Sequence, residues 1–343
     1  MKTLYDISWK VTEPEYRADP ALSYSTLSRF AREGFNNLDT LFERIETPSL
    51  TFGSAVDALI TGGQEEFEKN FFVAEFPPVT ESVEKMVKAL FAEFCVTHHT
   101  LSSIPDVEII GRTEALKYQL NWKPETRAKV IKEQGSEYYS LMYVANGRTI
   151  IDTALKEQID NAVMALRTSP ATAMFFFDGD SLERNYQLKF KATFEGVDYR
   201  CMADLIIVDH RNKVVYPIDL KTSSHAEWDF YQSFVKWRYD LQARLYWRII
   251  RDNMDRDEQF KDYKLTDYKF IVVNKKTLTP LVWKFTATQA KGKLTFGKEG
   301  TIELQDPFEL GKELSIYLSS RPPVPLGIEL TEENNIIEWL NKI

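Results

Sequence analysis

The chain has 343 residues, of which 43% are hydrophobic and 27% charged, so it can bury a sizeable core and bulk disorder is not expected. Its formal net charge of −8 argues against a protein that coats nucleic acid nonspecifically. Two cysteines exclude a disulfide framework and a cysteine-ligated iron–sulfur cluster, and the expected compartment is a reducing cytoplasm. No apolar run approaches the ~20 residues of a membrane helix, so no membrane partner is expected.

The N-terminal part of the chain has helical patterns. Apolar residues recur at helical spacing over 21–46, with Ser23 or Ser25 as the N-cap and Gly34 as the expected break. A second helix is expected over 52–59, where apolar residues predominate and polar residues are sparse. This part of the chain is therefore expected to be helical rather than to contribute strands.

Residues 80–135 differ in composition from the segments on either side. They are rich in Lys, Glu and Gln and contain few strand-forming residues, so helices are expected near 81–96 and 125–134. This stretch is the candidate for a helical lobe added to the main domain. A further helix is expected over 151–168, where apolar residues again recur at helical spacing.

From about residue 182 the pattern changes from helices to strands. Hydrophobic and polar residues alternate with the period of two that a strand requires, and polar turn residues separate the runs. Pro217 interrupts one run, which favours an edge strand or a bulge there. The elements expected are strands around 186–190, over 197–208 and over 214–221, a helix over 228–251, and strands over 268–273 and 279–285.

These patterns divide the chain into four parts. One hydrophobic core usually stops growing near ~250–300 residues, so a chain of this length is expected to carry an added lobe or a second domain. The expected parts are an N-terminal helical part of the main domain at 1–80, a helical insertion or lobe at 81–150, an α/β core at 151–290 and a C-terminal extension at 291–343.

Two aspartates and a lysine fall on neighbouring strands of the expected core. With the polar run at 209–212 as a hairpin turn, position 204 pairs near 217 or 218, so Asp204 and Asp219 lie one or two residues apart along adjacent strands. The strand period of two places Asp219 and Lys221 on the same face. One face of the sheet is therefore expected to present two carboxylates and one ammonium group.

This expected pair of carboxylates predicts a metal site. Two carboxylates so close repel each other unless a cation lies between them. Their oxygen ligands favour Mg²⁺ or Mn²⁺, which bind phosphate oxygens and lower the pKa of a bound water. Lys221 is then placed to orient or deprotonate that water and to offset charge on phosphorus. The alternative is an ordinary salt-bridged strand face, because Asp-x-Lys also occurs by chance.

Four local patterns resemble motifs of the PD-(D/E)xK nuclease superfamily, and more closely those of exonuclease VIII (RecE)-like and RecB-type nuclease domains. Two are similar to the strands that carry the family's metal-binding aspartates, and one is similar to its Q-x-x-x-Y helix. The fourth, in two pieces, is similar to its upstream S-x-S-x-L and G-x-x-x-H-x-L-L helices. In that order, the segments are Arg200–Asp204, Ile218–Thr222, Tyr239–Tyr246, and Leu22–Leu27 with Phe52–Leu59.

The resemblance implies an α/β fold of the PD-(D/E)xK restriction-endonuclease-like type. In this fold a mixed central sheet is flanked by helices, and the nuclease core would be the part at 151–290. The resemblance also implies that Asp204, Asp219 and the Leu220 carbonyl hold Mg²⁺ (or Mn²⁺), and that Lys221 assists the attacking water. These residues are the predicted catalytic centre.

Two further acids are candidate metal ligands. The family's upstream helix usually carries a histidine that reaches the metal, and this sequence has Asp57 there, which either preserves binding through oxygen or marks a changed activity. Glu183 matches an acid on the strand before the hairpin, where it either holds a second metal or pairs with Arg184 or Lys189. The resemblance thus adds Asp57 and Glu183 to the predicted metal site.

The helix after the sheet carries candidate substrate contacts. Gln242 and Tyr246 are four residues apart and share a helix face. The resemblance implies that Gln242 points into the site and contacts substrate or the attacking water; the alternative is a polar residue that faces the core. Arg244 and Arg248, with Arg251, form a stripe that either meets DNA phosphates or is an ordinary solvated face.

The resemblance therefore predicts a Mg²⁺-dependent DNA nuclease, in particular an exonuclease that degrades linear double-stranded DNA in phage-type recombination. The predicted DNA contacts are Ser25, near a helix N-terminus, together with Arg244, Arg248 and Tyr246. A homo-oligomer and a single-strand annealing recombinase as partner are also implied. The alternatives are a catalytically silent DNA-binding or assembly protein on the same fold, and a structure-specific endonuclease.

Overall fold

The computed structural model describes residues 2–42, 47–179, 181–286, 293–296 and 300–320. The chain forms two compact units, the first made of residues 1–46 and 164–343 and the second of residues 47–163. None of the described helices combines the length and the hydropathy that crossing a bilayer requires. Of the expected C-terminal extension at 291–343, residues 291–292, 297–299 and 321–343 lie outside the described residues.

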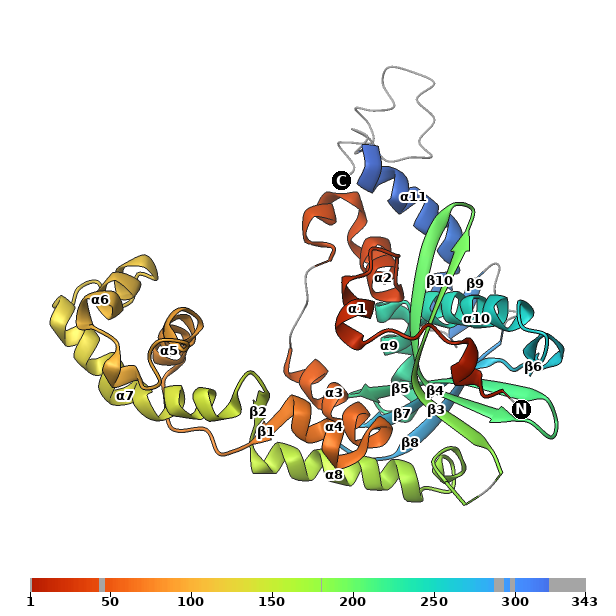
Figure 1. Cartoon of the computed structure of the whole chain (residues 1–343), viewed down its shortest axis with the longest axis horizontal. Helices are drawn as coiled ribbons and strands as arrows, with labels where there is room; N and C mark the ends of the chain where they lie inside the picture. The colour runs from red at the N-terminus through yellow and green to blue at the C-terminus, as the bar shows by residue number, and fades with distance from the viewer. Residues whose placement is uncertain (1, 43–46, 180, 287–292, 297–299, 321–343) are drawn as a thin grey trace. The chain divides into compact units, whose positions relative to one another are not determined.

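The second unit is mainly helical (Figure 1). Its central helices pack on one another so closely that a Cβ atom on Gly135 would lie 2.4 Å from the side chain of Val87. The unit begins at Thr47 and not near residue 81, so its first two helices group with those that follow them. Its elements are α3 Pro48–Thr61, α4 Gly63–Asn70, β1 Phe71–Val73, α5 Glu81–Phe94, η3 Leu101–Ser103, α6 Asp106–Ala115, α7 Pro124–Ala145, β2 Thr149–Ile151 and most of α8 Thr153–Thr168.

The first unit is a mixed α/β structure with a central sheet flanked by helices (Figure 1). Before the sheet, the chain forms η1 Leu4–Ile7, α1 Glu13–Ala18, α2 Tyr24–Glu33, η2 Gly34–Thr40 and η4 Ala173–Phe175. The sheet and the elements that follow are β3 Glu183–Phe194, β4 Val197–Asp209, β5 Val214–Ser223, η5 Glu227–Asp229, α9 Phe230–Trp237, α10 Tyr239–Asp255, η6 Phe260–Asp262, β6 Lys264–Leu265, β7 Tyr268–Asn274, β8 Pro280–Phe285, β9 Lys293–Phe296, β10 Gly300–Glu303 and α11 Pro307–Ser320.

The central sheet has the strand order β3-β4-β5-β7-β8, with β6 beside the start of β5. Neighbouring strands are antiparallel, with two exceptions: β5 runs parallel to β6 and to β7. Strand β5 is thus central, so the edge position suggested by Pro217 is wrong. Strand β6 pairs with positions 214 and 215 and β7 pairs from position 218 onward, so the proline lies where β5 changes neighbour. A missing N–H is tolerated at such a point.

Two expected helices have breaks at residues with positive φ. Gly34, at φ 69°, ends α2 as expected. The helix expected over 228–251 is instead two helices, α9 and α10, because Arg238 adopts φ 57° between them. The Arg238 guanidinium donates two hydrogen bonds of 3.0 Å to the fully buried Asp240 carboxylate, which stabilises the corner. This corner sets the direction in which α10 crosses the sheet.

Helix α10 packs across β3, β4 and β7 and against α2. Its apolar residues, including Leu245 and Ile249, join Ile206 of β4 and Phe270 of β7 in one buried core. Helix α2 begins with Ser23 as its N-cap, whose hydroxyl accepts from the Thr26 N–H. The face of the sheet under α10 is therefore closed by packed side chains, and polar groups placed there are removed from bulk water.

Candidate active site

The two predicted aspartates lie opposite each other where the β4–β5 ladder ends. The last residue pair of the ladder is Leu205 with Ile218, and this register continued by one step places Asp204 opposite Asp219. The expected hairpin is thus confirmed, with Asp204 one residue further along β5 than predicted. The Asp204 carboxylate accepts a hydrogen bond of 2.8 Å from the Leu220 N–H. A side-chain acceptor thus replaces a strand carbonyl, and it holds Asp204 beside β5.

Both carboxylates lie on the sheet face that α10 covers. Residues directly opposite in an antiparallel pair share a face, and alternate residues of one strand do so too. Ile206, two residues after Asp204, lies in the core under α10. Asp219 is only 1% exposed and accepts a hydrogen bond from the Gln242 side-chain amide of α10. Gln242 thus points toward the carboxylates, and its predicted contact with substrate or the attacking water stays a prediction.

Lys221 shares this face and forms an ion pair with Asp219, as the strand period predicts. Its side chain is 18% exposed, and its Nζ lies 5.0 Å from the centroid of the Tyr239 ring. Burial disfavours the charged amine, but the carboxylates of Asp219 and Asp204 and the Tyr239 hydroxyl outweigh this and raise the pKa of Lys221. In this arrangement Lys221 is held as an ammonium donor beside Asp219, and its predicted part in deprotonating a water stays a prediction.

Three tyrosines pack around the carboxylates. The Tyr246 ring makes edge contacts with Tyr24 and Tyr268, with centroids 6.5 Å and 6.3 Å apart. Burial raises the pKa of Tyr246 well above its ordinary value, and the nearby Asp219 and Asp204 add to this effect. Tyr246 is only 7% exposed, so its predicted contact with nucleic acid is wrong. Its role is to pack under α10 and to exclude water from the site.

Two buried polar atoms near the carboxylates have no hydrogen-bond partner among the described residues. They are the Oε1 of Gln242, a side chain that is 4% exposed, and the hydroxyl of Tyr268, which is 1% exposed. Buried polar groups are normally paired, so such atoms indicate a site for a polar ligand or ordered water. The acceptor on Gln242 lies on the same amide group that binds Asp219.

Glu183 does not belong to this group. It pairs in register with Val208, four residues along β4 from Asp204, which is about 13 Å at the usual strand rise. Its carboxylate accepts from the Leu4 N–H at 2.9 Å and from the Nε2 of His210 at 2.5 Å. The prediction of Glu183 as a metal ligand is therefore wrong: it anchors the N-terminal segment to the sheet. Within the described residues, the Glu183 carboxylate does not form the predicted pair with Arg184 or Lys189 but binds Leu4 and His210.

The predicted ligand set is reduced to a pair of carboxylates. Among the described residues, no three His, Cys, Asp or Glu side chains come together as a metal-binding group. Asp57 lies on α3 in the second unit, so its part in the site stays a prediction. Asp204 and Asp219 are the acids that the structure brings together, and the Leu220 carbonyl follows directly after Asp219 on β5.

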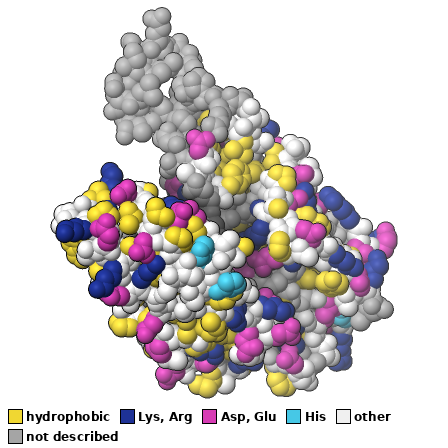
Figure 2. Space-filling view, turned by 60° about the vertical axis from the view of Figure 1, so that its left-hand side comes forward, with side chains coloured by type: hydrophobic (Ala, Val, Ile, Leu, Met, Phe, Trp, Pro, Cys, Tyr) yellow, Lys and Arg dark blue, Asp and Glu magenta, His cyan; other side chains and the backbone are white. Residues whose placement is uncertain are grey.

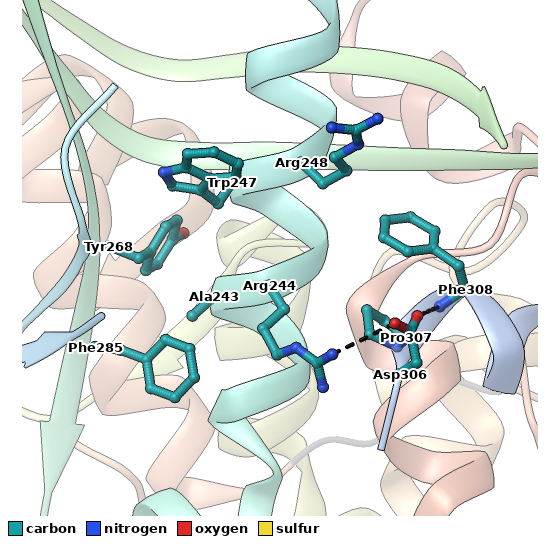
Figure 3. A pocket seen from close by; sticks show the side chains of 9 residues that line it. All are labelled: Ala243, Arg244, Trp247, Arg248, Tyr268, Phe285, Asp306, Pro307 and Phe308. Atoms are coloured by element: carbon teal, nitrogen blue, oxygen red, sulfur yellow. Dashed lines mark hydrogen bonds and ion pairs between the residues drawn. The ribbon is translucent and has the colours of Figure 1, made fainter. Parts of the chain in front are cut away.

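The arginine stripe of α10 is mostly engaged within the protein. Arg244 donates to the Gln305 carbonyl and lies 3.5 Å from Asp306, with its side chain 8% exposed. It lines a cavity of about 190 Å³ together with Trp247, Tyr268 and Phe308 (Figure 3). Because its guanidinium is buried and paired, the predicted contact of Arg244 with DNA phosphate is wrong. Burial lowers the pKa of Arg244.

The other predicted nucleic-acid contacts lie on the surface. Arg248 is exposed, and its guanidinium carbon lies 5.5 Å from the centroid of the Phe194 ring. Ser25 is exposed too, and its hydroxyl contacts that of Ser23 at 2.8 Å. Both stay predictions. On the face seen in Figure 2, Lys and Arg lie interspersed with Asp and Glu rather than in one basic patch.

Comparisons with known proteins give little further guidance. No protein-family model matches the chain, and no curated protein does. One similar solved structure is a chain from Eubacterium rectale described as a "putative exonuclease", with 14% identity and a TM-score of 0.43 over 82% of this chain and 79% of that one. At this level of similarity the neighbour carries no argument, so fold and function rest on this chain's own residues.

Proposed function

We propose that this protein is a Mg²⁺-dependent nuclease that hydrolyses phosphodiester bonds in DNA. One observation carries the proposal: Asp204, Asp219 and Lys221 converge on one buried sheet face, at the point where two strands separate. This is the set of side chains that the resemblance to PD-(D/E)xK nucleases assigns to catalysis. Gln242 reaches the same point from α10.

The residues present fit a divalent cation. Asp204 and Asp219, with the Leu220 carbonyl, would hold Mg²⁺ or Mn²⁺, which commonly bind through one or two carboxylates and leave other positions to water and substrate phosphate. The Oε1 of the buried Gln242, which no described residue contacts by a hydrogen bond, supplies a further acceptor for a bound water. When bound, the ion would lower the pKa of a water and neutralise charge on phosphate oxygens.

The chain's own residues supply the remaining chemistry. The Lys221 ammonium is placed to donate hydrogen bonds to phosphate oxygens and to stabilise the negative charge that grows on them during hydrolysis. In the absence of substrate, the Asp219 carboxylate neutralises the positive charge of the Lys221 ammonium. Gln242 donates to Asp219 and so fixes the orientation of that carboxylate. The packed tyrosines keep bulk water away, which strengthens each of these electrostatic interactions.

The finer activity is also a proposal. The resemblance in Asp219–Thr222 and in the helix that starts at Tyr239 supports an exonuclease acting on linear double-stranded DNA in recombination. The same resemblance supports a homo-oligomer that works with a single-strand annealing recombinase. Comparing linear with closed circular DNA separates this activity from that of a structure-specific endonuclease, because an exonuclease requires an end.

The test is digestion of linear DNA by the full chain with Mg²⁺, with and without a chelator, for wild type and Asp219→Asn. We expect wild type to digest DNA only with the metal and Asp219→Asn to lose the activity. The matched control is Glu183→Gln, which removes a carboxylate from the same sheet but away from the pair. Equal digestion by wild type and Asp219→Asn contradicts the proposal. Tight DNA binding without any digestion by wild type favours the catalytically silent alternative.

A further inference from the structure

The corner between α9 and α10 places one aromatic residue on each side of Arg238. The left-handed backbone of Arg238 and its paired hydrogen bonds to Asp240 hold the corner in one conformation. Tyr239, after the corner, faces inward, since its ring centroid lies 5.0 Å from the Nζ of Lys221. Trp237, before the corner, is 40% exposed. The corner thus holds an exposed indole two residues from the ring that covers the active-site lysine.

Two cations lie over the Trp237 ring. The guanidinium carbon of Arg32 and the Nζ of Lys236 are each 5.0 Å from a ring centroid of Trp237. Both side chains belong to exposed residues, and within the described part of the chain neither has an ion-pair partner. Arg244, by contrast, is paired with Asp306. The chain has a net charge of −8, yet this corner presents an indole with two positive charges that no carboxylate of the described residues pairs with.

Helix α2 connects this surface to the active site. The Tyr24 hydroxyl donates a hydrogen bond of 2.6 Å to the Trp237 carbonyl, and the Tyr24 ring contacts the Tyr239 ring at 6.3 Å between centroids. Ser25 and Arg32 are seven residues apart on α2, so they share one helix face, and both are exposed. A set of contacts therefore runs from the Tyr239 ring beside Lys221, through Tyr24, to the backbone of Trp237.

We infer that Trp237, Arg32 and Lys236 form a nucleotide subsite beside the active site. The indole stacks one unpaired base, and the two cations bind the phosphates next to it. Aromatic side chains stack any base, and cations that flank them bind the backbone. A base inside a duplex already has stacking neighbours on both sides, so the subsite takes its base from a single strand or a frayed end. This inference rests on the proposed nuclease function and adds the form of DNA that the site receives.

The test is DNA binding by the full chain in an Asp219→Asn background, which keeps the oligonucleotide intact. Fluorescence anisotropy of a labelled single strand gives the Kd of this parent and of variants that add Trp237→Ala, Trp237→Phe or Trp228→Ala. Trp228 is the matched control, since it is 75% exposed and lies in the same segment between β5 and α10. We expect Trp237→Ala to weaken binding about tenfold or more, Trp237→Phe to keep most of the affinity, and Trp228→Ala to stay within about twofold of the parent.

The two cations are tested separately, because each contacts the Trp237 ring on its own. Arg32→Ala and Lys236→Ala should each weaken binding and reduce the slope of log Kd against log salt by about 0.7 per lost phosphate contact on a single strand. A blunt-ended duplex should lose less affinity than the single strand when Trp237 is replaced by Ala, because it offers no unpaired base.

Two results would overturn the subsite: equal changes in Kd for Trp237→Ala and Trp228→Ala, or unchanged salt slopes in both cation variants. Its failure is distinguishable from that of the nuclease proposal. A wild-type protein that binds single strands through Trp237 but does not digest DNA with Mg²⁺ supports the subsite and refutes the nuclease. A wild-type protein that digests DNA while Trp237→Ala keeps full affinity refutes the subsite alone.

Discussion

Helix α10 carries polar residues on two faces, and the residues of the two faces have different kinds of partner. On the sheet side, the amide of Gln242 donates to the carboxylate of Asp219. On the other side, Arg244 binds Gln305 and Asp306 and lines a cavity (Figure 3). Both residues satisfy a helical spacing in the sequence. Only the partners that the fold supplies separate a residue at the proposed reaction site from one that holds the fold together.

The positive charges of Lys221 and Arg244 also differ in their surroundings. The buried cation of Lys221 faces carboxylates at a point where the strands separate and a ligand is expected to enter. The cation of Arg244 faces a carboxylate and a carbonyl and is fully engaged. Beside Lys221 and Asp219, the Oε1 of Gln242 has no hydrogen-bond partner in the described part of the chain, whereas Arg244 is engaged by Gln305 and Asp306. Variants at these positions should therefore divide cleanly into losses of activity and losses of stability.

The largest expected effect is at Lys221. Lys221→Met keeps the length of the side chain and removes its charge, so we expect DNA digestion to fall by about 10²–10³-fold, the cost of removing one preorganised donor. The matched control is Lys269→Met on β7, a half-buried lysine whose Nζ lies 5.3 Å from the Tyr216 ring. The rate of digestion per folded protein is measured for both. Equal rates for both variants would contradict the role of Lys221.

A smaller effect is expected at Gln242. Gln242→Leu keeps the volume and removes the donor to Asp219, so activity should fall about 10–100-fold, as for other residues that orient a metal ligand. Asn253→Ala, on the same helix, removes hydrogen bonds to the Lys191 and Ile249 carbonyls and serves as the control. Digestion rates and melting temperatures are compared. A loss of stability in Gln242→Leu with unchanged activity would assign it a structural role only.

The smallest effect on activity is expected at Arg244. Arg244→Ala should lower the free energy of unfolding by about 1–3 kcal/mol, because it leaves the Gln305 carbonyl and Asp306 without their partner. The exposed Arg248→Ala should change it by no more than about 0.5 kcal/mol. Denaturant titration and digestion rates are measured together. Weaker DNA binding by Arg244→Ala with unchanged stability would restore the phosphate contact that the structure argues against.

Features that depend on local interactions could be predicted from the sequence. The turn residues at 209–212 set the β4–β5 register, and the strand period placed Asp219 and Lys221 on one face. Both outcomes depend on neighbours within a single hairpin. The mixed α/β class follows from the same local patterns, since strands of alternating polarity are followed by the amphipathic helix α10.

The sequence failed where a partner comes from far along the chain. The Glu183 carboxylate is occupied by the Leu4 N–H and by His210, and the Arg244 guanidinium by residues some sixty positions later. The break at Arg238 left no pattern either, because helical spacing continues on both sides of it and a positive φ is rarely adopted by arginine. The exposed indole of Trp237 is visible only once that break is known.

The most direct test of the central claim is the binding of Mn²⁺ to the full chain, measured by titration calorimetry or electron spin resonance. The claim is that Asp204 and Asp219 together hold one divalent ion. We predict that Asp204→Asn and Asp219→Asn each weaken binding by more than the ~10–100-fold that changes outside the ligand shell cost, while Glu183→Gln keeps the wild-type affinity. Unchanged affinity in either aspartate variant, or equal weakening in all three, would contradict the claim.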